Sequence, residues 1–273
     1  MTVFEIAEKL SSVSKDDAEY EAKLLLSHFG GFSFSQILTQ NPDFNSESLS
    51  DAIEKRLART PIAYIMGKTE FYREKYFVSE DCLIPRSDTE IIVDYAIRNL
   101  PKNAYFADLC TGSGCIAISI LSNRSDCRAI ACDVSDGALK IAEKNARLNR
   151  VSDRIKFVSH DVLSYAIDDK FDAVISNPPY IKSDVIPTLS DEVKKEPRSA
   201  LDGGLDGMDF YRRILPLYKD KLKENGFFLF ETGYDQREAI INIAKENGFH
   251  CDCINDYGKN HRGAILKKLS SNK

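Results

Sequence analysis

The sequence of 273 residues lacks any apolar run near the length of a membrane span, and its seven cysteines include no CxxC pair. A helix needs roughly 20 apolar residues to cross a bilayer. The first stretch, MTVFEIAEKLSSVSKDD, is charged throughout and has no apolar core of a secretory signal. We therefore expect a globular protein of the cytoplasm without membrane contact. Cysteines placed inside apolar segments indicate buried, reduced thiols.

Metal ligands at the usual spacing and clusters of basic residues are also missing. The four histidines are scattered along the chain, so no metal site is expected. Residues 1–80 hold 9 Lys+Arg against 13 Asp+Glu, a net charge of −4 out of −5, which leaves −1 for the remainder. Binding to nucleic acid needs clustered cations, and we expect none here. The acidic N-terminal part suits a basic protein partner, although an acidic face is more often simply a solvated one.

Three segments differ in pattern. Over residues 1–60, apolar residues recur three and four positions apart, which predicts a small helical domain with a helix stop at Gly30-Gly31. Residues 61–84 alternate Tyr, Phe and Val with polar residues, which indicates a β-hairpin linker. Residues 85–273 form the third and largest segment.

Strand-like and helix-like stretches alternate beyond residue 100, which predicts βαβ units in an α/β fold with a mostly parallel, doubly wound sheet. The last two strands are joined by a short turn and can pair antiparallel as a hairpin. The expected strands are 105–110, 128–135, 155–162, 171–177, 226–233, 251–256 and 263–268. The expected helices are 114–124, 136–149, 209–226 and 235–248.

A glycine loop, FADLCTGSGCIA, joins the first of these strands to a helix. Gly112 and Gly114 allow a sharp turn and close approach of the backbone to a ligand, while the helix offers free N–H groups to an anion. The spacing of these glycines and Ala117 fits the dinucleotide fingerprint, and Asp133 ends the next strand, where an acid can bind ribose hydroxyls. A cofactor that contains a nucleoside is expected, and NAD and S-adenosylmethionine use the same crevice.

The residues around the loop resemble motif I of class I methyltransferases, whose pattern is D-L-G-T-G-S-G against DLCTGSG here. The resemblance implies S-adenosylmethionine as cofactor. It also implies a Rossmann-like sheet of seven strands with a C-terminal antiparallel hairpin. The family places an acidic residue after the third strand near adenine, and HDVL supplies it. The expected cofactor-binding residues are Cys110, Thr111, Gly112, Ser113, Gly114, Asp133, Asp161, Val162 and Asn177.

The tetrapeptide Asn177-Pro178-Pro179-Tyr180 follows the fourth strand, so it should face the same crevice. The Pro178 carbonyl and the Asn177 side-chain oxygen provide two acceptors for a substrate NH2 group. They would aim its lone pair at a sulfonium methyl, whose charge an aromatic face favours. The residues contain no strong base, and none is needed, because the proton can leave after nitrogen is methylated.

The N-P-P-Y sequence resembles the motif of amino-methyltransferases that act on planar NH2 groups. LIPRSDTE, PIAYIMGKTEFY, EPRSALDGGLDGMDFYRRI and ETGYDQ resemble segments of the HemK/PrmC family, the peptide chain release factor glutamine methyltransferases. That resemblance implies methylation of the glutamine in the Gly-Gly-Gln motif of class I release factors by a monomer. It further implies that Asn177 and Pro178 hold the glutamine amide, that Tyr180 lines the pocket and that the N-terminal domain docks the release factor.

Among the features that depart from the family pattern, two concern the cofactor. Cys110 stands where the family usually has the first loop glycine, and a residue other than glycine prefers negative φ there. Val162 occupies a position that is often aromatic. Two alternatives remain. The first is an adenine-N6 methyltransferase of DNA or RNA, which would need to grip phosphates. The second is an NAD-linked or non-catalytic nucleotide-binding protein, which leaves the N-P-P-Y motif unexplained.

Overall fold

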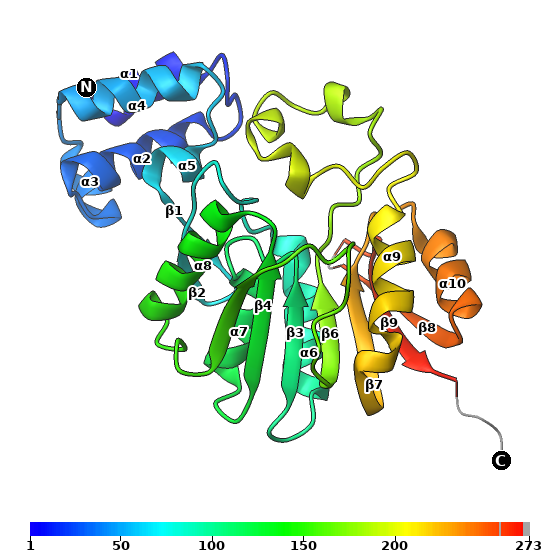
Figure 1. Ribbon diagram of the computed structural model, residues 1–273. Coiled ribbons are helices and arrows are strands. Elements are labelled where there is room, and N and C mark those ends of the chain that lie inside the picture. The colour runs from blue at the N-terminus through cyan, green and yellow to red at the C-terminus, as the bar shows by residue number, and fades with distance from the viewer. Residues whose placement is uncertain (257, 270–273) are drawn as a thin grey trace. The chain divides into compact units, whose positions relative to one another are not determined.

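Seven strands of the protein form one sheet, seen in a computed structural model that describes residues 1–256 and 258–269 (Figure 1). The strand order is β5-β4-β3-β6-β7-β9-β8. The first five strands are parallel, and β9 is antiparallel to both β7 and β8. The strands are β3 (Tyr105–Leu109), β4 (Arg128–Asp133), β5 (Ile155–Ser159), β6 (Phe171–Ser176), β7 (Leu222–Glu231), β8 (Phe249–Asn255) and β9 (His261–Lys268). The predicted fold class, including the antiparallel C-terminal pair, is confirmed.

Helices cover both faces of this sheet because its strands carry apolar side chains on both sides. On one face Phe106 of β3 packs in a cluster with residues of α6 and α7. On the other face Phe228 and Phe230 of β7 pack with α9 and α10. The helices are α6 (Glu90–Asn99), α7 (Cys115–Asn123), α8 (Asp136–Leu148), α9 (Asp209–Tyr218) and α10 (Arg237–Glu246). Short 3-10 turns occur at Ser87–Thr89, Ile186–Thr188, Val193–Lys195, Arg198–Ala200 and Lys219–Lys221.

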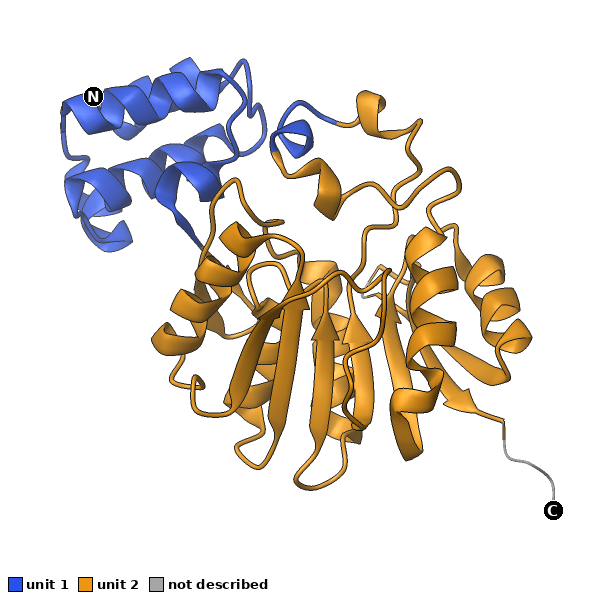
Figure 2. Cartoon of the chain, in the orientation of Figure 1, with its two compact units in different colours: residues 1–68, 190–195 blue, residues 69–189, 196–273 orange. Residues whose placement is uncertain are grey.

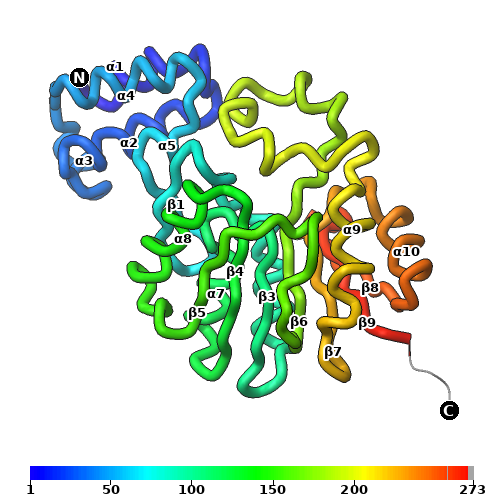
Figure 3. The backbone as a smooth tube through the Cα atoms, viewed as in Figure 1, coloured from blue at the N-terminus to red at the C-terminus, as the bar shows by residue number. Residues whose placement is uncertain are grey.

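The largest differences from the sequence expectation concern α9, β7 and α6. The helix expected over 209–226 ends at Tyr218, after Pro216, and β7 already begins at Leu222. A register shift in the pairing of β6 with β7 accommodates the early start, since Leu222 pairs with Phe171 and Phe227 with Ala173. Helix α6 was not predicted. Figure 3 traces the backbone through these elements.

The chain divides into two compact units (Figure 2), one of residues 1–68 and 190–195 and the other of residues 69–189 and 196–273. The first unit contains α1 (Val3–Leu10), α2 (Ala18–Gly30), α3 (Phe34–Gln40), α4 (Glu47–Leu57) and α5 (Ile62–Met66). Its core includes Ile6, Leu25, Leu26, Leu49 and Ile53. Gly31 adopts φ 73° directly after α2, as expected of a glycine helix stop.

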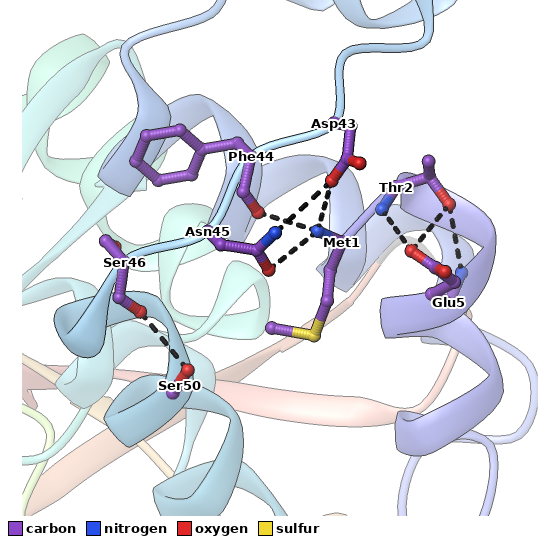
Figure 4. Close-up of polar contacts among 8 residues, drawn as sticks. All are labelled: Met1, Thr2, Glu5, Asp43, Phe44, Asn45, Ser46 and Ser50. Carbon is purple, nitrogen blue, oxygen red and sulfur yellow. Dashed lines mark hydrogen bonds and ion pairs between the residues drawn. The ribbon is translucent and has the colours of Figure 1, made fainter.

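Local hydrogen bonds define where the helices of the first unit begin (Figure 4). Thr2 and Glu5 form a capping box, in which the Glu5 carboxylate accepts from the Thr2 N–H at 2.8 Å. The amino group of Met1 contacts Asp43 Oδ1 at 2.6 Å and the Phe44 carbonyl at 2.9 Å. These contacts join the start of α1 to the segment that precedes α4.

A buried ion pair ties the non-contiguous segment into the first unit. Arg56 of α4, only 2% exposed, donates from Nε to Glu21 Oε2 at 2.8 Å and from its Nη2 to Glu21 Oε1 at 3.1 Å. Arg56 Nη1 lies 2.9 Å from Glu192 Oε1. The guanidinium therefore neutralises a helix carboxylate and a carboxylate from the segment 190–195 together.

The expected linker over 61–84 contains both a helix and a hairpin. Helix α5 occupies its start, and strands β1 (Lys68–Phe71) and β2 (Glu74–Phe77) pair with each other. Tyr76 of β2 is fully buried, and its hydroxyl lies 2.6 Å from Ser119 Oγ of α7. The end of the third expected segment, residues 270–273, lies outside the described residues, as does Tyr257. Within residues 1–256 and 258–269, no helix is long and apolar enough to span a membrane.

Candidate active site

The C-terminal ends of the parallel strands surround a cavity of about 670 Å³. In an open α/β sheet this edge is where ligands bind. The cavity lining includes most of the residues that the sequence singled out: Cys110, Thr111, Gly112, Ser113, Asp133, Asp161, Val162, Asn177 and Pro179. Gly114, Pro178 and Tyr180 are not part of the lining. The loops after four different strands therefore meet in one place.

Every second residue of the glycine loop, from Cys110 to Gly114, has a positive φ. The φ values are 58° at Cys110, 54° at Gly112 and 82° at Gly114. For a residue with a Cβ, this left-handed conformation costs roughly 1–2 kcal/mol, whereas glycine adopts it freely. Cys110 therefore carries a backbone strain that the usual family glycine avoids. Burial also raises the pKa of its thiol, which keeps the sulfur neutral beside the cavity.

Asp133 organises this loop from the end of β4. Its Oδ2 accepts from the Gly112 N–H at 2.9 Å, and its Oδ1 accepts from the Ser135 N–H at 3.0 Å. Burial raises the pKa of the carboxyl, while the backbone donors oppose that shift. Each oxygen retains acceptor capacity, so the carboxylate can receive hydroxyl groups of a ligand.

The loop after β5 contributes His160, Asp161, Val162 and Leu163 to the lining. Asp161 Oδ1 accepts from the Leu163 N–H at 2.9 Å. The hydroxyl of Ser164 is the main cause of the lowered pKa of Asp161, so this carboxylate is ionised at neutral pH. Val162 is buried and lines the cavity with a branched apolar side chain, which offers less area than an aromatic ring would.

The Asn177-Pro178-Pro179-Tyr180 segment directly follows β6. Asn177 Nδ2 donates to Thr89 Oγ1 at 3.2 Å, and Asn177 and Pro179 both line the cavity. Tyr180 differs from the expectation, because its hydroxyl donates to Glu231 Oε1 at 3.0 Å and its ring packs against the apolar cluster of β7 and α9. Burial raises the pKa of Tyr180, which makes it still less suited to act as a base.

The sequence alone did not assign roles to two stretches that line the cavity. Leu83, Pro85, Arg86 and Thr89 come from the segment before α6, and Ser199, Asp202 and Gly203 come from the segment before α9. Both stretches had stood out only through their family resemblance. Asp88 and Arg198 lie outside the lining and form ion pairs, with Arg262 at 3.1 Å and with Asp202 at 2.9 Å. Glu90 accepts from the Tyr72 N–H at 2.8 Å.

Gly203 packs against the backbone of the Asn177-Pro178-Pro179-Tyr180 segment. The Gly203 N–H donates to the Ile181 carbonyl at 2.8 Å, and Ile181 forms a parallel bridge with Asp202. A Cβ on Gly203 would lie 2.7 Å from the Pro179 carbonyl oxygen and 2.7 Å from Tyr180 Cα. Both contacts are with backbone atoms, so the two segments must separate to accept any side chain.

We expect Gly203→Ala to reduce turnover about 10- to 100-fold, because even a small displacement of a positioning group is costly to catalysis. Steady-state kinetics would measure the loss. Cofactor affinity should change less than turnover, since Gly203 packs against the motif and not against the glycine loop. Wild-type turnover in a folded Gly203→Ala protein would contradict the proposed tight packing.

Asp108 lies fully buried near the end of β3. Its Oδ2 accepts from Thr111 Oγ1 at 2.6 Å and from the Ala117 N–H at 3.2 Å, while its Oδ1 has no hydrogen-bond partner among the described residues. Burial raises the pKa of Asp108 to about 7. The Asp108 carboxyl thus fixes the glycine loop through these hydrogen bonds. Above about pH 7 it is a buried charge with one oxygen lacking a hydrogen-bond partner in the described part of the chain, which is unfavourable.

Asp108 should make the folded state less stable as pH rises. An unfolded aspartate has a pKa of about 4, so between about pH 4 and pH 7 the folded protein binds more protons and the free energy of unfolding falls. Asp108→Asn keeps an acceptor and removes this component. Urea unfolding at pH 5 and pH 8 would measure it, with Asp136→Asn on the exposed start of α8 as control. Equal pH dependence in wild type and Asp108→Asn would contradict the assignment.

No group of three or more His, Cys, Asp or Glu residues in the described part of the chain could hold a metal ion. The seven cysteines are all free thiols.

Known proteins match this chain along most of its length. The Methyltransferase small domain family matches residues 89–204, and the PrmC N-terminal domain family matches residues 5–67. A release factor glutamine methyltransferase of Clostridium acetobutylicum is 41% identical over 204 residues, which cover 73% of this chain and 72% of the relative. Another, of Thermodesulfovibrio yellowstonii, is 36% identical over 260 residues, 92% of this chain and 93% of the relative.

A solved structure shows the same fold at lower identity. The ribosomal protein L11 methylase from Lactobacillus delbrueckii subsp. bulgaricus has a TM-score of 0.51 at 24% identity and covers 67% of this chain and 81% of that one. This similarity supports the methyltransferase fold of the sheet and its helices.

Proposed function

Because the chain belongs to the family of release factor glutamine methyltransferases, we propose that it methylates the glutamine side-chain amide in the Gly-Gly-Gln motif of class I peptide chain release factors, with S-adenosylmethionine as the methyl donor. The observation that carries the proposal is the position of Asn177. Asn177 lines the same cavity as the glycine loop and Asp133.

The lining residues fit the cofactor. Gly112 leaves open space where a Cβ would stand, so the backbone can approach a ligand closely. Asp133 has acceptor capacity for ribose hydroxyls, Asp161 for a polar edge of adenine, and Val162 provides an apolar wall. S-adenosylmethionine supplies a methyl group on a positively charged sulfur. The neutral thiol of Cys110 leaves that charge undisturbed.

The Asn177 side chain, which lines the cavity, and the backbone carbonyl of the adjacent Pro178 would orient the substrate. Asn177 Oδ1 and the Pro178 carbonyl accept the two amide hydrogens and direct the nitrogen lone pair toward the methyl group. S-adenosylmethionine, when bound, would supply the methyl group that this nitrogen takes up, and the nitrogen would give its proton to water. Since an unactivated carboxamide is a weak nucleophile, alignment and exclusion of water provide most of the acceleration.

The remaining assignments follow from this substrate. We assign docking of the release factor to residues 1–60, whose acidity suits a basic surface, connection to residues 61–84 and catalysis to residues 85–273. The protein would act as a monomer in the cytoplasm, where translation ends. It would bind a protein and not a nucleic acid directly.

Transfer of labelled methyl from S-adenosylmethionine tests the proposal. The assay would contain a purified, unmodified class I release factor, with an adenine-containing DNA duplex in a parallel tube. We expect label on the glutamine of the Gly-Gly-Gln motif alone, located by mass spectrometry. Label on the duplex would instead support the adenine-N6 alternative, and label on neither would reject release factors as substrate.

A further inference from the structure

The side-chain amide of Asn177 has two ends of opposite character, and its task depends on which end faces the substrate. Nδ2 is a donor and Oδ1 an acceptor. Only Oδ1 can receive a hydrogen of a substrate amide. The two ends are nearly equal in size and shape, so the hydrogen-bond network around an asparagine decides its orientation. Nδ2 lies 3.2 Å from Thr89 Oγ1.

Thr89 can serve Asn177 only as an acceptor, because its single hydroxyl proton is used elsewhere. Thr89 Oγ1 lies 2.5 Å from Glu231 Oε2, and an ionised carboxylate accepts hydrogen bonds without donating any. The hydroxyl proton therefore points to Glu231, and a lone pair of Thr89 points to Asn177. That arrangement requires Nδ2, and not Oδ1, to face Thr89.

Glu231 is itself held firmly in place. It ends β7, directly after Phe230, which pairs with Ser176 immediately before Asn177. Its side chain accepts from the Tyr180 hydroxyl at 3.0 Å, and its backbone carbonyl accepts from the Tyr211 hydroxyl at 2.7 Å. Glu231 is 1% exposed and Thr89 is 2% exposed, so little water competes for these bonds.

We propose that Thr89 and Glu231 are positioning residues that set the orientation of the Asn177 amide, so that its Oδ1 is presented to the substrate NH2 group. This inference rests on the proposed function of Asn177. Neither residue touches the reacting atoms. Both residues act through the direction of the hydrogen bond between Thr89 and Asn177. The Glu231 carboxylate at the end of β7 can only accept, so Thr89 donates to it, and Asn177 Nδ2 in turn donates to Thr89.

The chain of hydrogen bonds from Glu231 through Thr89 to Asn177, called the relay below, has a pH-dependent consequence. Burial raises the pKa of Glu231 to about 7; the hydrogen bonds of Thr89 and Tyr180 and the charge of Arg262 oppose the increase, and Asp88 adds to it. Once protonated, Glu231 can donate a hydrogen bond to Thr89. The Thr89 hydroxyl is then free to donate to Asn177 Oδ1, so the side-chain amide of Asn177 rotates and presents Nδ2 to the substrate. Turnover should therefore fall as pH decreases through about 7.

Three variants separate this relay from a merely structural role. Thr89→Val keeps the shape of the side chain but removes the hydroxyl, and we expect a loss of about 10-fold in kcat. Thr89→Ser retains the hydroxyl and should restore most of that loss. Glu231→Gln can donate to Thr89 and should reverse the amide, for a loss on the order of 100-fold. Cofactor affinity, measured by calorimetry, should stay within a few-fold in all three.

The decisive experiment combines these changes in a double-mutant cycle with release factor as substrate. Without the Thr89 hydroxyl, Glu231 has no hydrogen-bonded path to the Asn177 side-chain amide, so Glu231→Gln should cost much less in the Thr89→Val background than in wild type. Equal costs in both backgrounds, or wild-type kcat in folded Thr89→Val, would overturn the proposal.

A second readout does not need the substrate. The Asn177 side-chain ¹⁵N–¹H signals, identified by their loss in Asn177→Ala, should shift in Thr89→Val and should titrate near pH 7 in wild type but not in Glu231→Gln. Signals unchanged by both variants would reject the relay. If wild type fails to methylate a release factor while these signals behave as expected, the proposed function fails and the relay stands.

Discussion

Replacing Asn177 with alanine is expected to reduce methyl transfer to the release factor about 1,000-fold, comparable to the loss of a preorganised polar group that acts on the transition state. Asn177 lies in the cavity wall, and its substitution removes an acceptor that holds the substrate nitrogen in line. The change leaves Asp133 and the glycine loop intact. S-adenosylmethionine affinity, measured by calorimetry, should therefore remain within a few-fold of wild type.

A matched control for this variant is Asn99→Ala. Asn99 ends α6 and its Nδ2 donates to the Tyr95 carbonyl at 2.9 Å on the exposed surface, outside the cavity lining. Its substitution should leave turnover unchanged. Circular dichroism and a melting curve would establish that both variants fold. Normal turnover of a folded Asn177→Ala protein would refute the role assigned to this residue.

Replacing Asp133 with alanine should weaken cofactor binding about 10- to 100-fold, because hydrogen bonds to a charged group contribute roughly 1.5–3 kcal/mol. The carboxylate offers acceptors to ribose and also receives the Gly112 N–H, so its loss both removes a ligand contact and loosens the loop. Calorimetric titration with S-adenosylmethionine would measure the effect. Turnover at saturating cofactor should decrease less than affinity.

The exposed Asp136→Ala, three residues away at the start of α8, provides the control for Asp133→Ala. It removes the same charge from the same neighbourhood without touching the cavity lining. An equal loss of affinity in both variants would mean that general electrostatic attraction, and not the hydrogen bonds of Asp133, accounts for the effect.

Local sequence pattern is sufficient to predict the central strands of the sheet. Strands β3, β4, β5 and β6 were predicted from short apolar stretches between helical stretches, and each occurs at the expected place. Their parallel order brings all their C-terminal ends to one edge. The meeting of Gly112, Asp133 and Asn177 at one cavity was therefore predictable from the sequence, since it follows from strand direction alone.

Other elements escaped prediction because competing tendencies decide them. The lysine-rich stretch after Tyr218 continues a helical pattern, but pairing with β6 draws Leu222 into β7. Tertiary pairing thus overrides local propensity. Tyr180 carries an aromatic ring that sequence reasoning directed to the ligand, whereas its hydrogen bond to Glu231 directs the side chain away from the cavity lining.

The sequence by itself determined the fold class, the family and the segments that supply the cavity, because these depend on periodicity and on motifs of adjacent residues. Only the tertiary structure decided which side chains act together. Thr89 lies 88 positions before Asn177, and Glu231 lies 51 positions after Tyr180, yet all four belong to one hydrogen-bond network. The polarity of such a network depends on distances of about 3 Å between groups on different elements, and no periodicity or spacing along the chain encodes those distances.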